Sequence, residues 1–488
     1  MSVTTPARTP AVAEPPPRAS GWPALRPLVL RLHFYAGLLI APFLLVAAAT
    51  GLLYAGSLQA EKIVYAHELR TEPGGTALPL SRQVDAALRA HPEGTVTAVR
   101  PADAPDATTR VILDAPGLKD DNSLAVFVDP YTAKVRGALE SYGSSGALPL
   151  RATIDHLHRD LLLGEPGRLY SELAASWLWV VALGGVLLWL GRRRSARRLR
   201  GTTGRRRTLS WHGTVGLWSA VGLVALSATG LTWSAYAGEH IGRLQDALGG
   251  ATPAVSTQVP GAATEMPGMD HGAHAGHEGH AGHEGHTGHE GHAGHEGHGG
   301  GADRPLAGLD ATLRTARSEG LSGPVEIRVP TASAPAFVVQ QTDKEFPAHL
   351  DSIAVDPASG RVTDRLDFAD HPLLAKATRW GIDLHMGLLF GLANQVALAA
   401  LMIALILLIV WGYRMWWQRR PRRDAGLRGG RAHPRGAWRR VPVTVLLPLA
   451  AATAVLGWFM PLFGIPLAGF LVLDVCAGAV ARRRARAA

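Results

Sequence analysis

Four histidines stand at matched places in two halves of the chain, and neutral imidazoles at such places could ligate a metal. His33 and His212 each precede a Thr-Gly-Leu triplet, and the spacing from histidine to triplet is the same in both cases. His158 and His385 are each the second residue of the motif Leu-His-x-x-Leu-Leu-x-Gly, and a tryptophan follows both of them at one constant spacing. A single histidine at the end of a membrane helix is often only a helix cap. Four histidines at matched positions in two halves of a chain instead predict a repeated set of ligands.

A second group of histidines recurs at every third residue of a glycine-rich tract. A segment of this composition cannot bury a core, so we expect it to be disordered without metal. Its imidazoles could hold a divalent Cu, Zn or Ni ion; Met266 and Met269 upstream would suit Cu(I), and no selectivity is fixed. A simple repeat with incidental affinity is the alternative. The candidate metal ligands are His271, His274, His277, His280, His283, His286, His289, His292, His295 and His298.

The apolar residues are gathered into long runs. In a chain of 488 residues with 47% hydrophobic content, several runs reach the roughly 20 helical residues that cross a bilayer. We therefore expect an α-helical multi-pass protein in contact with membrane lipid, without a cleaved signal peptide. The expected segments are a disordered cytoplasmic tail over 1–24, membrane segments over 29–56, 151–191 (a short helix and then the span), 211–237 and 380–417, and a C-terminal hairpin over 441–480.

Arginine sets the expected orientation of these segments. The short loops 192–210 and 418–440 are rich in arginine, and such loops stay in the cytoplasm. The net charge of +10 is therefore a topology signal, and we expect no nucleic-acid partner. The two large loops, 57–150 and 238–370, then lie outside the cytoplasm. The single cysteine, Cys476, excludes internal disulfides and thiolate metal sites.

Each large loop predicts a small α+β domain. A short amphipathic helix is followed by alternating runs and by a Val-Asp-Pro turn, which begins at Val128 and again at Val355. Fewer residues separate His33 from its counterpart His212 than separate His158 from its counterpart His385. The additional residues in the second interval are about as many as those of the segment that holds the histidine tract. The tract, at 266–299, is thus an insertion into one copy of a duplicated span–loop–span unit.

Together these features resemble the PepSY-associated transmembrane family, often described as iron-regulated membrane proteins. The resemblance covers about 29–418 and leaves the tail, the insertion and the last two spans outside it. It implies a duplicated TM–PepSY–TM unit that forms a four-helix bundle in a bacterial inner membrane. It also implies two non-covalent b-type haems on membrane histidines, because similar members include ferric-siderophore reductases.

The places of the four histidines agree with two haem sites. His33 and His212 follow arginines at the cytoplasmic ends of their spans, and His158 and His385 lie at outer ends. Each pair could give one imidazole to either face of a haem iron. The glycines four residues after His33 and His212 would let a flat macrocycle or a helix approach closely. His156 remains an alternative to His158 at the outer site.

The expected activity is that of a membrane ferric-chelate reductase, used in iron uptake. The sequence contains no flavin, nicotinamide or covalent-haem motif. Electrons would therefore come from a quinol or a separate cytoplasmic reductase and would pass to an extracytoplasmic metal complex. The alternative is a membrane metal-homeostasis protein without redox turnover, which captures Cu, Zn or Ni through its histidine-rich loop.

Overall fold

The computed structural model of the chain describes residues 22–119, 121–192, 204–259, 306–418 and 441–487. Its helices and strands fall into two compact units. Unit 1 comprises Met1–Leu39, Val180–Trp218 and Val410–Ala488. Unit 2 comprises Ile40–Trp179 and Ser219–Ile409.

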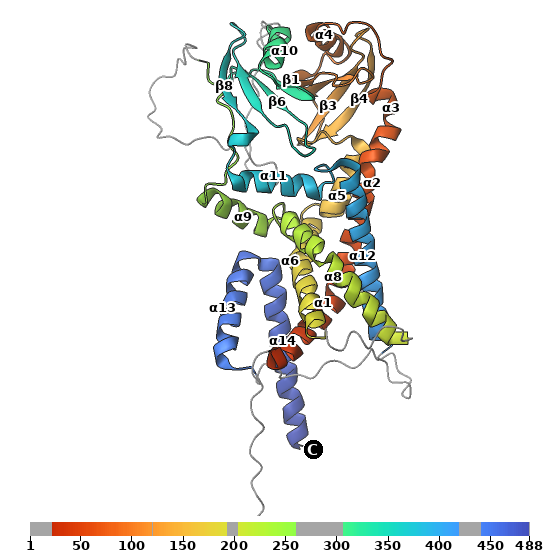
Figure 1. Ribbon diagram of the computed structural model, residues 1–488, viewed down its shortest axis with the longest axis vertical. Helices are drawn as coiled ribbons and strands as arrows, with labels where there is room; N and C mark the ends of the chain where they lie inside the picture. Colours follow the sequence, from red (N-terminus) through yellow and green to blue (C-terminus); the bar gives the residue numbers. More distant parts are fainter. Residues whose placement is uncertain (1–21, 120, 193–203, 260–305, 419–440, 488) are drawn as a thin grey trace, which may run out of the picture. The chain divides into compact units, whose positions relative to one another are not determined.

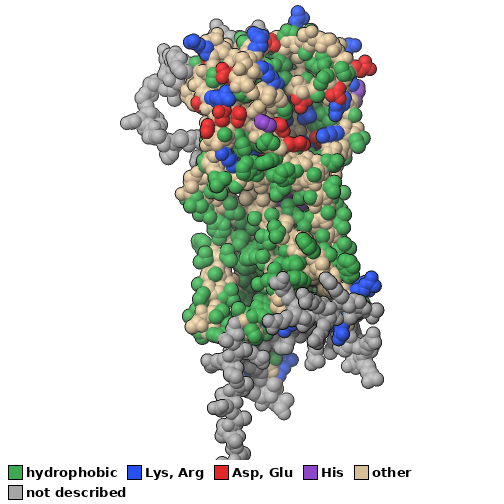
Figure 2. All heavy atoms as spheres, viewed as in Figure 1, with side chains coloured by type: hydrophobic (Ala, Val, Ile, Leu, Met, Phe, Trp, Pro, Cys, Tyr) green, Lys and Arg blue, Asp and Glu red, His purple; other side chains and the backbone are tan. Residues whose placement is uncertain are grey.

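Five helices in the described part of the chain are long and apolar enough to cross a membrane. At about 1.5 Å of rise per residue, each matches the roughly 30 Å hydrocarbon core of a bilayer. Hydrophobic side chains cover these spans, whereas charged side chains gather over the sheet of unit 2 (Figure 2). The chain is therefore a multi-pass membrane protein. The spans are α2 (Ala41–Val64), α6 (Glu165–Leu190), α8 (Gly204–Leu231), α12 (Gly391–Trp417) and the Pro461–Ala481 part of α14 (Pro461–Ala487).

The first expected membrane segment, 29–56, is covered by two helices instead of one. Helix α1 (Trp22–Leu39) ends at Leu39, and α2 begins at Ala41. Pro42 lies in the first turn of α2, where its missing N–H and fixed φ suit a helix start. The same ring would break the hydrogen bonding of a helix that continued through it. The break between α1 and α2 therefore has a local cause in the sequence.

The C-terminal segment forms a helical hairpin within unit 1. Its first helix, α13 (Val443–Phe459), is shorter than the other spans and is followed directly by α14. The two helices approach closely at Gly457 and Gly464, where a Cβ on Gly464 would lie 2.6 Å from the Cα of Gly457. Small residues allow such close helix contacts in a membrane.

The two large loops build one antiparallel sheet, although the sequence predicts a separate α+β domain for each. The strands follow the order β4-β3-β2-β1-β5-β6-β7-β8, so that each half is a four-stranded meander (Figure 1). The meanders join where β1 pairs with β5, through Ala98 opposite Arg328 and Val99 opposite Ile327. The strands are β1 (Thr95–Arg100), β2 (Thr109–Asp114), β3 (Asn122–Val128), β4 (Val135–Tyr142), β5 (Val325–Arg328), β6 (Phe337–Gln341), β7 (Ser352–Val355) and β8 (Val362–Leu366).

Two amphipathic helices cover the same face of this sheet, one from each half (Figure 1). They are α4 (Leu80–Ala90) and α10 (Leu309–Ser318). Their apolar sides share one core with the alternating inward residues of the strands, including Val99 and Ile327 at the join. Asp310 of α10 accepts hydrogen bonds from the Leu80 N–H (2.6 Å) and the Ser81 hydroxyl (2.6 Å) at the start of α4. A carboxylate at a helix start satisfies free N–H groups, so the two halves stabilise each other.

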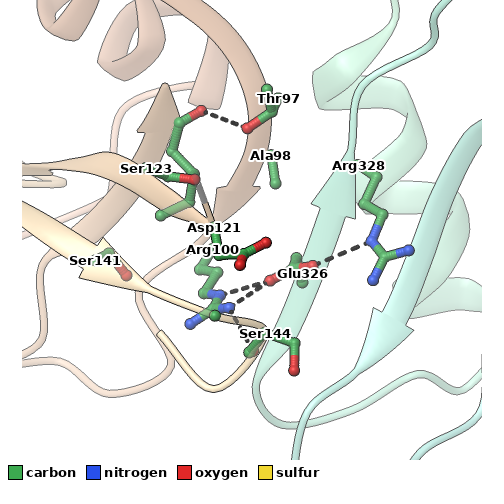
Figure 3. Close-up of a pocket in the computed structure, with 11 residues that line it drawn as sticks. Thr97, Ala98, Arg100, Asp121, Ser123, Ser141, Ser144, Glu326 and Arg328 are labelled. Atoms are coloured by element: carbon green, nitrogen blue, oxygen red, sulfur yellow. Dashed lines mark hydrogen bonds and ion pairs between the residues drawn. The ribbon is translucent and has the colours of Figure 1, made fainter. Parts of the chain in front are cut away.

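A buried carboxylate also bridges the join between the halves. Glu326 of β5 accepts a hydrogen bond from Arg100 of β1 (Nε to Oε2, 2.7 Å), and Arg328 lies on its other side, beside a hydroxyl-lined pocket (Figure 3). Burial opposes ionisation of Glu326, but Arg100 and then Arg328 outweigh it and hold the pKa of this carboxyl below its usual value.

Short helices next to the spans carry the candidate residues of unit 2. Helix α5 (Pro149–Asp160) precedes α6 and ends just after His158, and α11 (Leu373–His385) precedes α12 and ends at His385. In Figure 1, α9 (Tyr236–Ala247) and α11 run crosswise to α2. The side chains of Gln245 on α9 and Thr378 on α11 hydrogen-bond at 2.7 Å. The remaining short elements are α3 (Ala66–Leu69) and the 3-10 turn η2 (Phe368–Asp370).

Candidate functional site

The structure brings the four sequence-predicted histidines together in two pairs. In unit 1, the ring centroids of His33 on α1 and His212 on α8 lie 6.3 Å apart, with 73° between the ring planes. In unit 2, the ring centroids of His158 on α5 and His385 on α11 lie 6.5 Å apart, with 52° between the planes. Each pair combines one histidine from each half of the duplicated sequence.

The spacing within each pair suits an ion held between two imidazoles. A metal–imidazole bond is about 2 Å long, so two imidazoles on opposite sides of one ion place their ring centroids about 6 Å apart. Both measured separations are close to this value. The rings are too far apart for a direct nitrogen–nitrogen hydrogen bond to explain the pairing. Each pair therefore has the separation expected of two imidazoles that share one ion.

In the His158–His385 pair, a threonine hydroxyl lies at hydrogen-bond distance from His158. Thr50 on α2 donates its hydroxyl proton to the Val46 carbonyl (2.9 Å), which leaves its oxygen free to accept. That oxygen lies 2.8 Å from Nδ1 of His158. In the tautomer whose Nδ1–H donates to this oxygen, Nε2 of His158 keeps its lone pair. A lone pair on Nε2 is what metal ligation requires.

The second half repeats this arrangement around His385. Thr229 on α8 donates to the Ala225 carbonyl (2.8 Å), and its oxygen lies 2.7 Å from Nδ1 of His385. Thr229 belongs to the second Thr-Gly-Leu triplet, as Thr50 belongs to the first. The triplet noted in the sequence therefore holds the partner of each histidine of this pair. Sequence reasoning noted the triplet without giving it this role.

In the His33–His212 pair, a backbone carbonyl supports His33. Nδ1 of His33 lies 3.0 Å from the carbonyl oxygen of Val181 on α6. A carbonyl can only accept, so Nδ1 carries the proton and Nε2 of His33 keeps its lone pair. This contact was not predicted from the sequence, because a backbone carbonyl is present at position 181 whatever the side chain.

Glycines line both pairs where a side chain would meet an imidazole. A Cβ on Gly51 would lie 3.2 Å from Cε1 of His158, and a Cβ on Gly230 would lie 3.6 Å from Cε1 of His385. On α6, a Cβ on Gly184 would lie 3.5 Å from His33, and one on Gly185 would lie 3.2 Å from it. The glycines of the Thr-Gly-Leu triplets thus give the histidines of unit 2 room beside the helix backbone.

Burial keeps the imidazoles of α5 and α11 neutral. Desolvation lowers the pKa of His158 to about 4. Desolvation, followed by the nearby His158, lowers the pKa of His385 to about 3. Neutral imidazole is the form that ligates metal, so both residues are in the ligating form at neutral pH.

His156, the alternative to His158, lies in a different cluster. Its Nδ1 is 3.3 Å from Asp160 Oδ2 and 3.2 Å from Arg159 Nη2, and its ring centroid is 4.6 Å from that of Tyr142. His158, and not His156, faces His385. Beside His385, Trp233 packs edge-on with its ring centroid 5.4 Å away, a contact that sequence reasoning did not foresee.

The histidine tract falls outside the described residues, as do the tail before Trp22 and most of both arginine-rich loops. Among the residues that the structure does describe, no group of three or more His, Cys, Asp or Glu side chains could hold a metal ion. The metal ligands proposed at 271–298 therefore stay a prediction.

Comparison with known protein families identifies this chain's family. The family model described as the PepSY-associated TM region matches residues 30–419, which is most of the chain. The search of curated proteins found no match. The matched residues include all four paired histidines and end before the hairpin α13–α14.

Proposed function

The chain belongs to the family of the PepSY-associated TM region, and from that premise we propose that it is a haem-binding membrane oxidoreductase. Its function would be to pass electrons across the membrane to an extracytoplasmic metal complex, as a ferric-chelate reductase does. The observation that carries the proposal is the pairing of His33 with His212 and of His158 with His385 at the separation of axial ligands.

The paired residues fit two b-type haems. Each pair offers two imidazoles to one iron, and the hydrogen bonds at Nδ1 leave the Nε2 lone pairs of His33, His158 and His385 free. Haem, when bound, supplies the one-electron redox chemistry. The glycines beside the histidines leave space that larger residues would fill.

The chain's own residues then have three roles. The four histidines hold and orient the bound groups. Thr50 and Thr229 hold a proton on Nδ1 of their histidines and keep the rings from turning. Burial of His158 and His385 excludes water and keeps them neutral, as the low pKa values of both indicate.

The duplicated unit supports this proposal at the level of architecture. We place α1–α2, α6, α8 and α12 as the four spans of a TM–PepSY–TM unit repeated twice and packed as a four-helix bundle. Support comes from the matched meanders of the sheet and from the two threonine–histidine hydrogen bonds, which repeat with the sequence motifs. A bundle of this kind is a common setting for cofactors held by facing helices.

The proposed orientation follows the arginines. Loops 192–210 and 418–440 would lie in the cytoplasm of a bacterial inner membrane, and the sheet would lie outside it. The electron donor would be a quinol or a cytoplasmic reductase. The acceptor would be an oxidised metal complex on the side of the sheet.

A second function rests on the histidine tract. Ten histidines at a spacing of three in a glycine-rich segment favour capture of Cu, Zn or Ni by that loop. This would make the chain a membrane metal-homeostasis protein without redox turnover. The two functions differ in whether electrons cross the membrane.

Transport of electrons can be tested in sealed proteoliposomes of the full chain that enclose a membrane-impermeant ferric chelate. With a reducing quinol added outside, we expect the enclosed iron to be reduced. The rate should fall to that of protein-free vesicles in His385→Ala. A deletion of 266–299 should keep the rate, whereas metal capture alone would give binding of Cu, Zn or Ni and no reduction at all.

A further inference from the structure

A charged pair is buried where the C-terminal hairpin meets the first helix. Arg31 on α1 and Asp474 on α14 form an ion pair with side-chain exposures of 8% and 16%, and both belong to unit 1. Asp474 is the only acidic residue in the sequence from 441 to its end. An unpaired carboxylate in a membrane-spanning helix raises the free energy of the folded state, so pairing with Arg31 stabilises this contact.

An aromatic contact one helical turn away fixes the register of the two helices. The ring centroids of Tyr35 and Phe470 lie 5.0 Å apart, and Cζ of Arg31 lies 5.2 Å from the centroid of Tyr35. Residues four apart on α1 thus meet residues four apart on α14 in reverse order. Helices in antiparallel contact pair their residues in this way.

The opposite side of α1 carries His33. Residues two apart on an α-helix point about 200° away from each other, so Arg31 and His33 project to opposite sides of α1. Arg31 contacts α14, and His33 contacts Val181, Gly184 and Gly185 of α6. Helix α1 is therefore held between the hairpin on one side and α6 on the other.

We infer that Asp474 is a positioning residue: through Arg31 it seats α1 so that His33 meets His212. This inference rests on the proposed function for its purpose, because it assigns the hairpin a role in building one of the two histidine pairs. The hairpin lies beyond the residues that the family model matches.

The test of positioning does not depend on a bound cofactor. In a full-length Cys476→Ala background, His33→Cys and His212→Cys leave one pair of cysteines, which a short bis-maleimide can crosslink. We expect a high yield with Asp474, a several-fold lower yield with Asp474→Asn, and recovery with Asp474→Glu. Thr453→Ala on α13, whose hydroxyl donates to the Leu449 carbonyl within the helix, is the matched control. An unchanged yield in Asp474→Asn would overturn the inference.

A second readout uses the histidine-containing full chain. Asp474→Asn removes a negative charge from the contact between α14 and α1, and loss of a nearby negative charge favours the reduced state of a redox group. We expect Asp474→Asn to raise the midpoint potential of the haem that His33→Ala removes and to leave the other unchanged. Equal shifts of both haems would contradict a local role. Absence of haem from the unaltered chain would refute the proposed function, while the crosslinking result would still decide the role of Asp474.

Discussion

The two histidine pairs have nearly the same ring separation but are supported in different ways. In the His158–His385 pair, each imidazole is hydrogen-bonded by a threonine of the repeated triplet. In the His33–His212 pair, His33 is hydrogen-bonded by a backbone carbonyl of α6 and sits beside two glycines. Side chains therefore contact both imidazoles of the first pair, and a backbone carbonyl contacts His33 of the second. The first can be altered by a single conservative substitution, whereas the second depends on how α1 is seated.

The largest effect is expected from removing an imidazole. His385→Ala or His158→Ala should remove one haem per chain, and His33→Ala or His212→Ala should remove the other. The measurement is the reduced-minus-oxidised absorption spectrum of the purified chain, whose amplitude should fall by about half. His156→Ala is the matched control and should keep the full amplitude. Loss of both haems in every single variant would show that the pairs are not independent sites.

Replacing a threonine should weaken one pair only. Thr229→Val and Thr50→Val remove the acceptor for Nδ1–H, and loss of such partners commonly costs about 10–100-fold in metal affinity or activity. Haem retention of the His158–His385 site, measured by transfer to an apo-haem acceptor, should fall by this order. Thr453→Val removes a hydroxyl of the same local geometry far from any paired histidine in sequence and should change nothing. If both sites lost haem equally, the proposed difference in support would be wrong.

Alanine substitution of the glycines should show how much space lies beside each imidazole. Gly51→Ala brings a Cβ to 3.2 Å from His158 and 3.3 Å from Met402 Sδ, whereas Gly230→Ala leaves 3.6 Å to His385. We expect Gly51→Ala to broaden or shift the haem spectrum and Gly230→Ala to be tolerated. Gly56→Ala on the same helix has no atom within 4 Å and is the control. A larger spectral change in Gly230→Ala than in Gly51→Ala would contradict the packing described for α2.

Low pH should destabilise the folded chain, because His158 and His385 are buried in unit 2. As the pH falls below the ordinary histidine pKa of 6.5, the unfolded chain takes up protons on His158 and His385, while the folded chain resists until about pH 4 and about pH 3. The folded state therefore loses stability as the pH falls through this window. Thermal unfolding of the purified chain between pH 7 and pH 5 should show a smaller decrease in His158→Ala/His385→Ala. The exposed His349→Ala should keep the full decrease, and an identical decrease in all three would refute the assignment.

The smallest effect on the histidine pairs is expected from deleting the histidine tract. Removal of 266–299 should leave the haem spectrum of both pairs unchanged, because each proposed site has two histidines from outside the tract. The same deletion should abolish most binding of Cu(II) or Ni(II) to the purified chain, measured by titration calorimetry. A chain that lost its colour on deletion would contradict the separation of tract and pairs.

The repeated motifs and the long apolar segments could be predicted from the sequence. The membrane spans follow from long hydrophobic runs, and the four histidines follow from motifs in register. The partner of His158 could not be predicted, because Thr50 lies 108 residues away and only the packing of α5 against α2 brings them together. The Val181 carbonyl has no side-chain signature at all.

Two features of the fold also needed the structure. Fusion of the two meanders depends on a short pairing between β1 and β5, which leaves no pattern beyond that of ordinary strands. The break in the first span follows from Pro42, but proline is common enough inside membrane helices that its presence did not predict an end. Here α13 and α14 contain Pro448 and Pro466 without a break.

The most direct test of the central claim is the haem content of the intact chain, purified from membranes and measured as the pyridine haemochromogen. If each histidine pair holds one haem iron, as we propose, the chain carries two b-type haems, both six-coordinate and low-spin by electron paramagnetic resonance. A chain that binds no haem, or whose haem is high-spin with one open axial position, would contradict the account.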